Sequence, residues 1–316
     1  MHSPVYLAIC TVSLSSMLWL GAPGLTSTVL GSTLAIAVLG VPHGGLDHWT
    51  GRRLLRERFK DHWWAIFFPA YLLVGLVFAL GWIAAPTTSV VLFFLISAWH
   101  FGREDQQASN RSARWSSTER AARHVAAVAV GGLVIWVPAL ARPDEMRSLL
   151  QMIVPAESID SAIRIVDATR MVASVLVPLA IGFIIASLVE SPLALERWVP
   201  VATVAIAIFA PILISFSVYF CGWHSWLGLQ RLRREESLSV AQFVRHVAPL
   251  SVAAILGVAV AGWWLQGAAV DSILQGQTSP SLRIVFIGLS AIAVPHLLLH
   301  ELDSSIDRSP SIQEVC

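Results

Sequence analysis

The chain has 316 residues, of which 56% are hydrophobic and only 13% are charged. Soluble domains carry roughly a quarter charged residues, so this composition excludes an ordinary soluble domain and favours a protein that is dissolved in lipid. The formal net charge of +1, without a basic stripe, gives no indication of nucleic acid as a partner. Three widely separated cysteines, with no CxxC pair, argue against a disulfide framework or a zinc knuckle.

Nine apolar runs follow one another along the chain. A helix needs roughly 20 mainly apolar residues to cross a bilayer, and backbone groups at that depth have no water partner, so we expect these runs to be helical. We predict an all-α fold, a polytopic transmembrane helical bundle that forms a single domain over residues 1–302, followed by a polar tail over 303–316. The runs are 5–22, 26–42, 63–84, 86–101, 123–141, 171–189, 198–222, 246–265 and 281–299.

Arginine- and lysine-rich connections follow the second, fourth and seventh runs, and such loops remain on the cytoplasmic side of a membrane. The three loops cannot share one side if all nine runs cross. One run between 123 and 222 should therefore fail to span, unless the amphipathic stretch 143–170 adds a crossing. The long run 198–222 is the first candidate because Pro211 interrupts it. We expect about eight crossings of a cell (inner) membrane, with the basic loops cytoplasmic.

Five of the ten histidines lie at the C-terminal ends of apolar runs. Ionisable residues in such places usually face the bundle interior and mark function, although a single histidine at a membrane interface is more often an ordinary hydrogen-bonded residue. If the basic loops share one side, these run ends meet at one depth. Imidazoles that meet in this way suit a first-row transition metal, whereas calcium and magnesium prefer oxygen ligands. The predicted metal-binding residues are His43, His100, His224, His296 and His300.

Other polar residues are placed to hold the predicted ligand imidazoles through the ring nitrogen that does not face the metal. His296 and His300 are four residues apart and therefore share one helical face. His43 and Asp47 have the same spacing, so the Asp47 carboxylate is a candidate to hold a ligand imidazole through its other nitrogen. The residues expected in this supporting role are Asp47, His48 and Glu301, and Glu104 and Asp105 are further nearby carboxylates that could take it.

The same segments resemble a known family. The pieces are PHGGLDH at 42–48, AWHFG around His100, the YF and WHS segment that ends at Ser225, and PH at 295–296. In this order they resemble the Brp/Blh family of membrane β-carotene 15,15′-dioxygenases, and with the apolar runs the resemblance covers most of the chain. PHGGLDH is the most specific of the pieces.

This resemblance implies an Fe(2+)-dependent enzyme that uses O2 to split β-carotene, or a similar carotenoid, at its central double bond into two retinal molecules. The retinal would then serve a rhodopsin. By motif, it implies iron ligands at His43, His100 and His224. The family tends to carry another histidine four residues after the one in the WHS segment, where this chain has Gly228. The site then has either three histidines or a fourth from elsewhere. The candidates for the fourth are His296 and His300.

Alternative functions remain open on the sequence. A carotenoid- or retinal-binding membrane protein, or a permease, that has lost catalysis is the main alternative, because Gly228 leaves the implied ligand set incomplete. A membrane di-iron hydroxylase or desaturase needs a larger set of histidines in HxxxH and HxxHH clusters. This chain has one HxxxH, at 296–300, and no HH pair, which disfavours that class.

Overall fold

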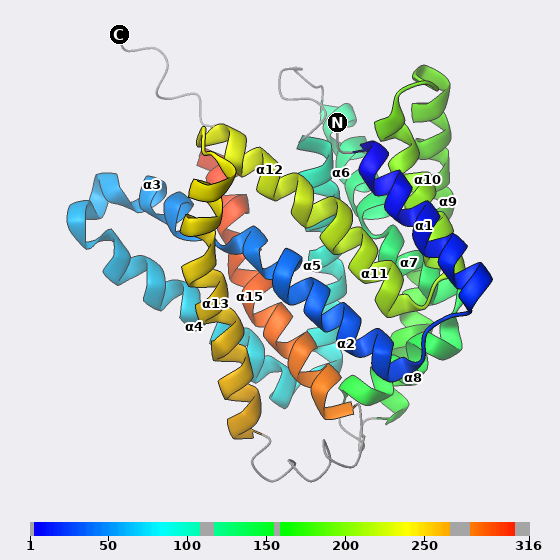
Figure 1. The fold of residues 1–316 in the computed structure, drawn as a ribbon, viewed down its shortest axis with the longest axis horizontal. Coiled ribbons are helices and arrows are strands. Elements are labelled where there is room, and N and C mark those ends of the chain that lie inside the picture. The colour runs from blue at the N-terminus through cyan, green and yellow to red at the C-terminus, as the bar shows by residue number, and fades with distance from the viewer. Residues whose placement is uncertain (1–2, 108–116, 155–158, 266–278, 307–316) are drawn as a thin grey trace.

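The computed structural model describes residues 3–107, 117–154, 159–265 and 279–306. Over these ranges every regular element is helical and no strand occurs, which confirms the predicted all-α bundle (Figure 1). The predicted polar tail, 303–316, begins within the last helix, and its residues from 307 onward lie outside the described part.

The N-terminal half consists of eight α-helices joined by short connections. Two shorter helical segments, η1 (Ile36–Gly40) and η2 (Val41–Gly44), lead directly from α2 towards α3, and η3 (Lys60–His62) leads into α4. The α-helices are α1 (Ser3–Leu20), α2 (Leu25–Ala35), α3 (Asp47–Phe59), α4 (Trp63–Ala84), α5 (Pro86–Gln107), α6 (Ser117–Gly131), α7 (Leu133–Ala141) and α8 (Pro143–Ile153).

The C-terminal half contains the longest helices. They are α9 (Ile159–Glu190), α13 (Val240–Leu265) and α15 (Ser279–Ile306). The shorter elements are η5 (Leu195–Trp198), α10 (Val199–Phe209), α11 (Ile212–Tyr219), η6 (Phe220–Ser225) and α12 (Trp226–Glu235). The amphipathic stretch 143–170 corresponds to α8 and the start of α9, with 155–158 outside the described residues.

Within the described residues, six helical stretches are long and apolar enough to cross a membrane, or seven if the pair α6 and α7, bent by 55°, is one span. The sequence predicts about eight. One of the six, Leu25–Trp82, contains two predicted runs on either side of the polar helix α3. The suspected run 198–222 is broken at Pro211 into α10 and α11, and the continuous stretch there is Ile212–Glu235.

Two π-helical segments lie next to each other in the interior. Segment η1 follows α2, and η6 connects α11 to α12. A Cβ atom on Gly40 would lie 2.5 Å from the Phe220 ring, so only glycine permits this approach. Segments with π-helical geometry occur frequently at functional sites. His224 lies within η6, and His43 lies in η2, directly after η1.

Helices α5 and α6 are held together by small residues. A Cβ atom on Gly131 would lie 2.2 Å from the backbone nitrogen of Gly102 and 2.5 Å from the carbonyl oxygen of Ala98. In lipid, where apolar side chains gain little by leaving the solvent, such close backbone contact is a main source of helix association. The contact fixes α5 on both sides of His100.

Gly131→Ala should therefore separate α5 from α6 and destabilise the protein. Overpacking of this kind costs on the order of 1–3 kcal/mol. Thermal unfolding of the detergent-solubilised protein would show a lower midpoint. Gly182→Ala is the matched control, because a Cβ atom at Gly182 meets nothing within 4 Å. Equal midpoints for the two variants would contradict this packing argument.

Candidate metal centre

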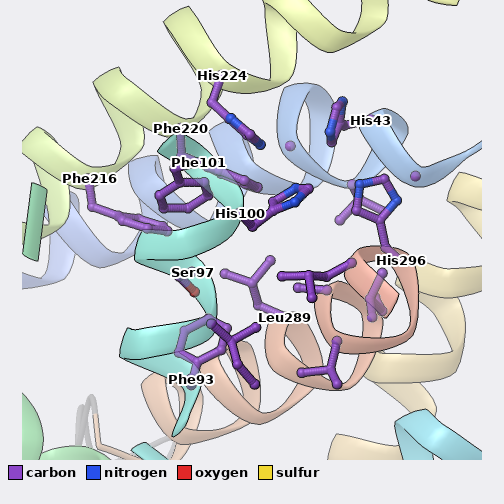
Figure 2. Close-up of a pocket in the computed structure, with 18 residues that line it drawn as sticks. His43, Phe93, Ser97, His100, Phe101, Phe216, Phe220, His224, Leu289 and His296 are labelled. Atoms are coloured by element: carbon purple, nitrogen blue, oxygen red, sulfur yellow. The ribbon is translucent and has the colours of Figure 1, made fainter. Parts of the chain in front are cut away.

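Four imidazoles from distant parts of the chain meet in the interior (Figure 2). His43 comes from η2, His100 from α5, His224 from η6 and His296 from α15. Their exposed fractions are 9%, 8%, 2% and 5%, so all four are buried. We call these four residues the histidine cluster. The sequence predicted that these run ends would meet at one depth, and the structure places them together.

The four rings form a closed circuit with nearly equal sides. Ring centroids are 4.8 Å apart for His43 and His296, and 5.4 Å apart for His296 and His100. The circuit continues with 5.1 Å from His100 to His224 and 5.2 Å from His224 to His43. Two imidazoles that bind one ion at roughly 2.1 Å have centroids on the order of 5–6 Å apart. The spacing therefore fits a shared ion.

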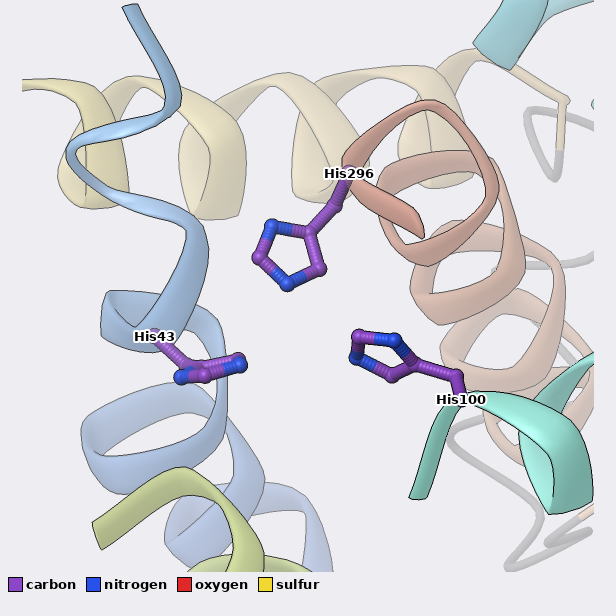
Figure 3. A group of neighbouring side chains, drawn as sticks. All are labelled: His43, His100 and His296. Carbon is purple, nitrogen blue, oxygen red and sulfur yellow. The ribbon is translucent and has the colours of Figure 1, made fainter. Parts of the chain in front are cut away.

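Ring nitrogens in the cluster lack hydrogen-bond partners among the described residues. They are both nitrogens of His43, both of His224, and Nε2 of His296. Buried polar atoms are nearly always paired, and each unpaired one costs about 1–3 kcal/mol. Nitrogens of His43, His100 and His296 also lie within 4.8 Å of one another, and Figure 3 shows these rings facing a common space. Buried, unpaired and convergent imidazoles are a donor set that fits a transition metal.

Asp47 lies directly behind His296. Its two carboxylate oxygens are 2.8 and 2.9 Å from Nδ1 of His296, which leaves Nε2 directed to the cluster. The Tyr71 hydroxyl donates a hydrogen bond to the same carboxylate at 2.6 Å. The sequence spacing had suggested Asp47 as a partner of an imidazole such as His43, four residues before it. The structure instead pairs it with His296 on a different helix, the usual arrangement behind a metal-bound imidazole.

A second tyrosine and carboxylate lie behind His224. The Tyr219 hydroxyl donates to Oδ2 of Asp105 at 3.0 Å, and Oδ1 of Asp105 is 3.7 Å from Nδ1 of His224. Two opposite members of the cluster, His224 and His296, thus each face an aspartate that accepts a tyrosine hydrogen bond. This repeated tyrosine–aspartate–histidine order stiffens the site from two sides.

His300 lies beside the cluster and does not line the pocket described below. Its ring centroid is 4.4 Å from that of His296, but its own nitrogens lie 3.8 Å from Asp47 and 3.6 Å from Glu104. Glu104 in turn pairs with Arg231 at 3.2 Å. Asp47, His296 and His300 offer ligand atoms within 4.8 Å of one another, so the prediction of His300 as a metal ligand stays open, although its nitrogens also face two carboxylates.

The other two residues expected to support the site lie farther out. His48 is half-buried and packs beside Trp49, with 6.1 Å between ring centroids. Glu301 accepts a hydrogen bond from the Trp99 indole at 3.1 Å and lies 3.6 Å from Arg103. Neither side chain lines the pocket at the cluster.

An apolar pocket opens from the histidine cluster (Figure 2). Apart from the four imidazoles, Ser97 is the only polar side chain among the described residues that lines it. No carboxylate lines the pocket, because the acids lie behind the imidazoles. The apolar lining comes from α5, η6, α11 and α15 and includes Phe93, Phe101, Phe216, Phe220, Leu289 and Leu297.

Comparison with known proteins identifies the family. The family model described as "Beta-carotene 15,15'-dioxygenase" matches residues 34–302, which include the whole histidine cluster. The chain belongs to this family. The resemblance inferred from the motifs is therefore confirmed.

Two relatives in this family cover most of the chain. The beta-carotene 15,15'-dioxygenase of an uncultured marine bacterium, 66A03, is 27% identical over 284 residues, which are 84% of this chain and 90% of the relative. The probable beta-carotene 15,15'-dioxygenase Blh of Halobacterium salinarum is 25% identical over 308 residues, 87% of this chain and 86% of the relative. No solved structure matches the chain.

Gly228 stands where the family resemblance implies a histidine, and the structure shows what this glycine contacts. A Cβ atom at Gly228 would lie 2.0 Å from Cε1 and 2.3 Å from Nδ1 of His43. Any side chain at this position requires the His43 ring to move. The glycine therefore leaves room for the His43 ring in its present position. The His296 ring packs against the His43 ring on a different side.

Some residues around this family's site carry no clear signal in the sequence. Tyr71 lies inside an apolar run, where a tyrosine is an ordinary residue of a membrane helix. Its hydrogen bond to Asp47 becomes evident only in the folded structure. Tyr219 and the pocket phenylalanines are equally inconspicuous. Asp105 and Glu104 follow the AWHFG motif closely, so their proximity to His100 in sequence is the one signal that points to them.

Asp47→Asn should weaken metal binding about 10- to 100-fold, because the neutral amide no longer fixes the His296 ring as a carboxylate does. Tyr71→Phe should produce a smaller loss in the same direction. Chelator competition on the purified protein measures both. Asp303→Asn, which removes a carboxylate paired with the exposed Arg53, is the control. Unchanged affinity in Asp47→Asn would contradict the role of this carboxylate.

Gly228→Ala should displace the His43 ring and lower the metal content of the purified protein, while the chain still inserts into membranes. Gly222→Ala is the matched control, since its Cβ atom would meet only ordinary contacts at 3.7 Å. Metal analysis per chain separates the two variants. Full metal retention by Gly228→Ala would show that His43 is not needed where the structure places it.

Proposed function

We propose that the protein uses O2 to cleave β-carotene, or a related carotenoid, at its central double bond into two retinal molecules, with Fe(2+) as the cofactor. The observation that carries this proposal is the position of four buried imidazoles, three of them with unpaired ring nitrogens, at one end of an otherwise apolar pocket. The names of both relatives support the substrate and the reaction.

In this proposal His43, His100, His224 and His296 hold the iron, and His300 supports His296 together with Asp47. Ferrous iron, when bound, supplies the activation of dioxygen, which amino-acid side chains do not provide. Neutral imidazoles add no negative charge to the site, and the Asp47 carboxylate, bonded to Nδ1 of His296, fixes which nitrogen of that ring faces the ion.

The protein's own contribution is to position the polyene and to exclude water. The pocket walls of phenylalanine and aliphatic side chains suit a conjugated hydrocarbon, which is already dissolved in the bilayer and can enter between helices. Which double bond reaches the cluster then depends on how much chain length fits on either side. Central cleavage in this proposal requires that equal lengths of polyene fit on the two sides of the cluster.

The chemical balance of the reaction agrees with the placement of the acids. Cleavage by O2 transfers one oxygen atom to each of the two aldehydes and needs no net proton. A general acid or base in the pocket is therefore unnecessary, and no carboxylate lines it. The carboxylates instead contact imidazoles, tyrosines and arginine.

We further infer that the protein lies in the cell (inner) membrane with its basic segments in the cytoplasm. Helices α3 and α12, which follow His43 and His224 directly, carry arginines that favour that side. The histidine cluster would then lie towards the cytoplasmic end of the bundle. The retinal product remains soluble in lipid and is available for hand-over to a rhodopsin in the same membrane.

Expression in a carotene-accumulating host tests the proposal. The wild-type chain should remove the colour and produce retinal, two molecules for each β-carotene consumed, whereas His224→Ala should leave the colour unchanged. His62→Ala, which alters an exposed histidine, is the control and should behave as the wild type. A wild-type protein that purifies with intact carotenoid and forms no retinal would establish the non-catalytic binder instead.

A further inference from the structure

Ser97 is the one polar group of the pocket that the proposed iron site does not use. It lies on α5, three residues before His100, which places it on the same face at roughly 4.5 Å along the helix axis. Its exposed fraction is 9%, and Figure 2 shows it at the pocket wall below the imidazoles. The remaining pocket lining beyond the cluster is apolar.

The Ser97 hydroxyl forms no hydrogen bond with the described residues. Oγ of the buried Ser225 also has no partner among the described residues, but the buried helix serines Ser215 and Ser290 donate to a carbonyl of the preceding turn. Ser215 does so to Ile212 at 2.9 Å, and Ser290 to Ile287 at 2.8 Å. A buried hydroxyl without a partner is unfavourable in apolar surroundings. The Ser97 hydroxyl is thus available to a ligand in the pocket.

The chemistry of the proposed reaction indicates which ligand that is. The carotene substrate is a hydrocarbon and offers no hydrogen-bond acceptor. Cleavage creates two carbonyl oxygens, and both arise at the carbons that lie against the histidine cluster, one helical turn from Ser97. Of the two polyenes that occupy this pocket, the hydrocarbon substrate and the aldehyde product, only the aldehyde therefore offers an acceptor to the Ser97 hydroxyl.

We propose that the Ser97 hydroxyl donates a hydrogen bond to the carbonyl oxygen of a newly formed aldehyde and makes the pocket bind retinal in preference to a hydrocarbon polyene. This inference rests on the proposed function. It assigns Ser97 to product recognition and leaves the binding of the intact carotene to the apolar walls.

The test compares two ligands on the purified, iron-containing protein without oxygen. The ligands are all-trans retinal and its hydrocarbon analogue, in which a methyl group replaces the aldehyde. Quenching of tryptophan fluorescence measures both affinities. Ser97→Ala should weaken retinal binding about 2- to 10-fold, the value of one net hydrogen bond, and leave the hydrocarbon affinity unchanged.

Two further variants complete the design. Ser290→Ala is the matched control, because its hydroxyl is already bonded within α15 and does not line the pocket; both affinities should stay at wild-type values. Ser97→Cys keeps a side chain of similar size with only a weak donor and should lose most of the preference for retinal. It replaces Ser97→Ala if that variant does not fold.

The outcomes separate this inference from the proposed function. If Ser97→Ala weakens both ligands equally, Ser97 only packs, and the inference is overturned while carotenoid cleavage stands. The same holds if the variant changes neither affinity. If the wild-type protein binds neither polyene, both this inference and the proposed function are overturned.

Discussion

Unpaired imidazole nitrogens in the interior of a membrane bundle are the costly feature on which the rest of this structure depends. Each buried nitrogen without a partner costs about 1–3 kcal/mol, and lipid offers no water to compensate. Helix packing around the cluster keeps the rings in place despite this cost. Glycines at 40, 131 and 228 permit contacts that any Cβ atom would prevent, so η1, α6 and α12 approach the histidine-bearing elements closely. An ion shared by the four rings would recover the cost.

Charged side chains and apolar side chains lie on opposite sides of the histidine cluster. The acidic side chains lie behind the imidazoles, where tyrosines, His300 or Arg231 contact them. The opposite side of the cluster is the apolar pocket, in which Ser97 is the only other polar side chain. The rings thus have an apolar pocket on one side and fixed carboxylates on the other. This arrangement suits a reaction of O2 with a hydrocarbon.

Much of this arrangement follows from the sequence, and the remainder depends on three-dimensional contacts. Apolar runs predict helices because lipid leaves the backbone no alternative, and the basic loops predict that His43, His100, His224 and His296 meet at one depth. Helical spacing suggested a partner for Asp47 four residues away, but the π-helical and 3-10 turns near His43 change the local geometry, and the carboxylate pairs with His296 instead. Tyr71 and Tyr219 become recognisable only after folding, since an isolated tyrosine in an apolar run has many ordinary roles.

X-ray absorption at the iron edge of the reconstituted protein tests the central claim most directly, because it counts the imidazoles bound to the metal. The present account predicts a shell of nitrogen neighbours at roughly 2.1 Å with the outer scattering of four imidazoles, falling to three in His296→Ala and unchanged in His300→Ala. A shell composed mainly of carboxylate oxygens, or the same imidazole count in the wild type and in His296→Ala, would contradict it.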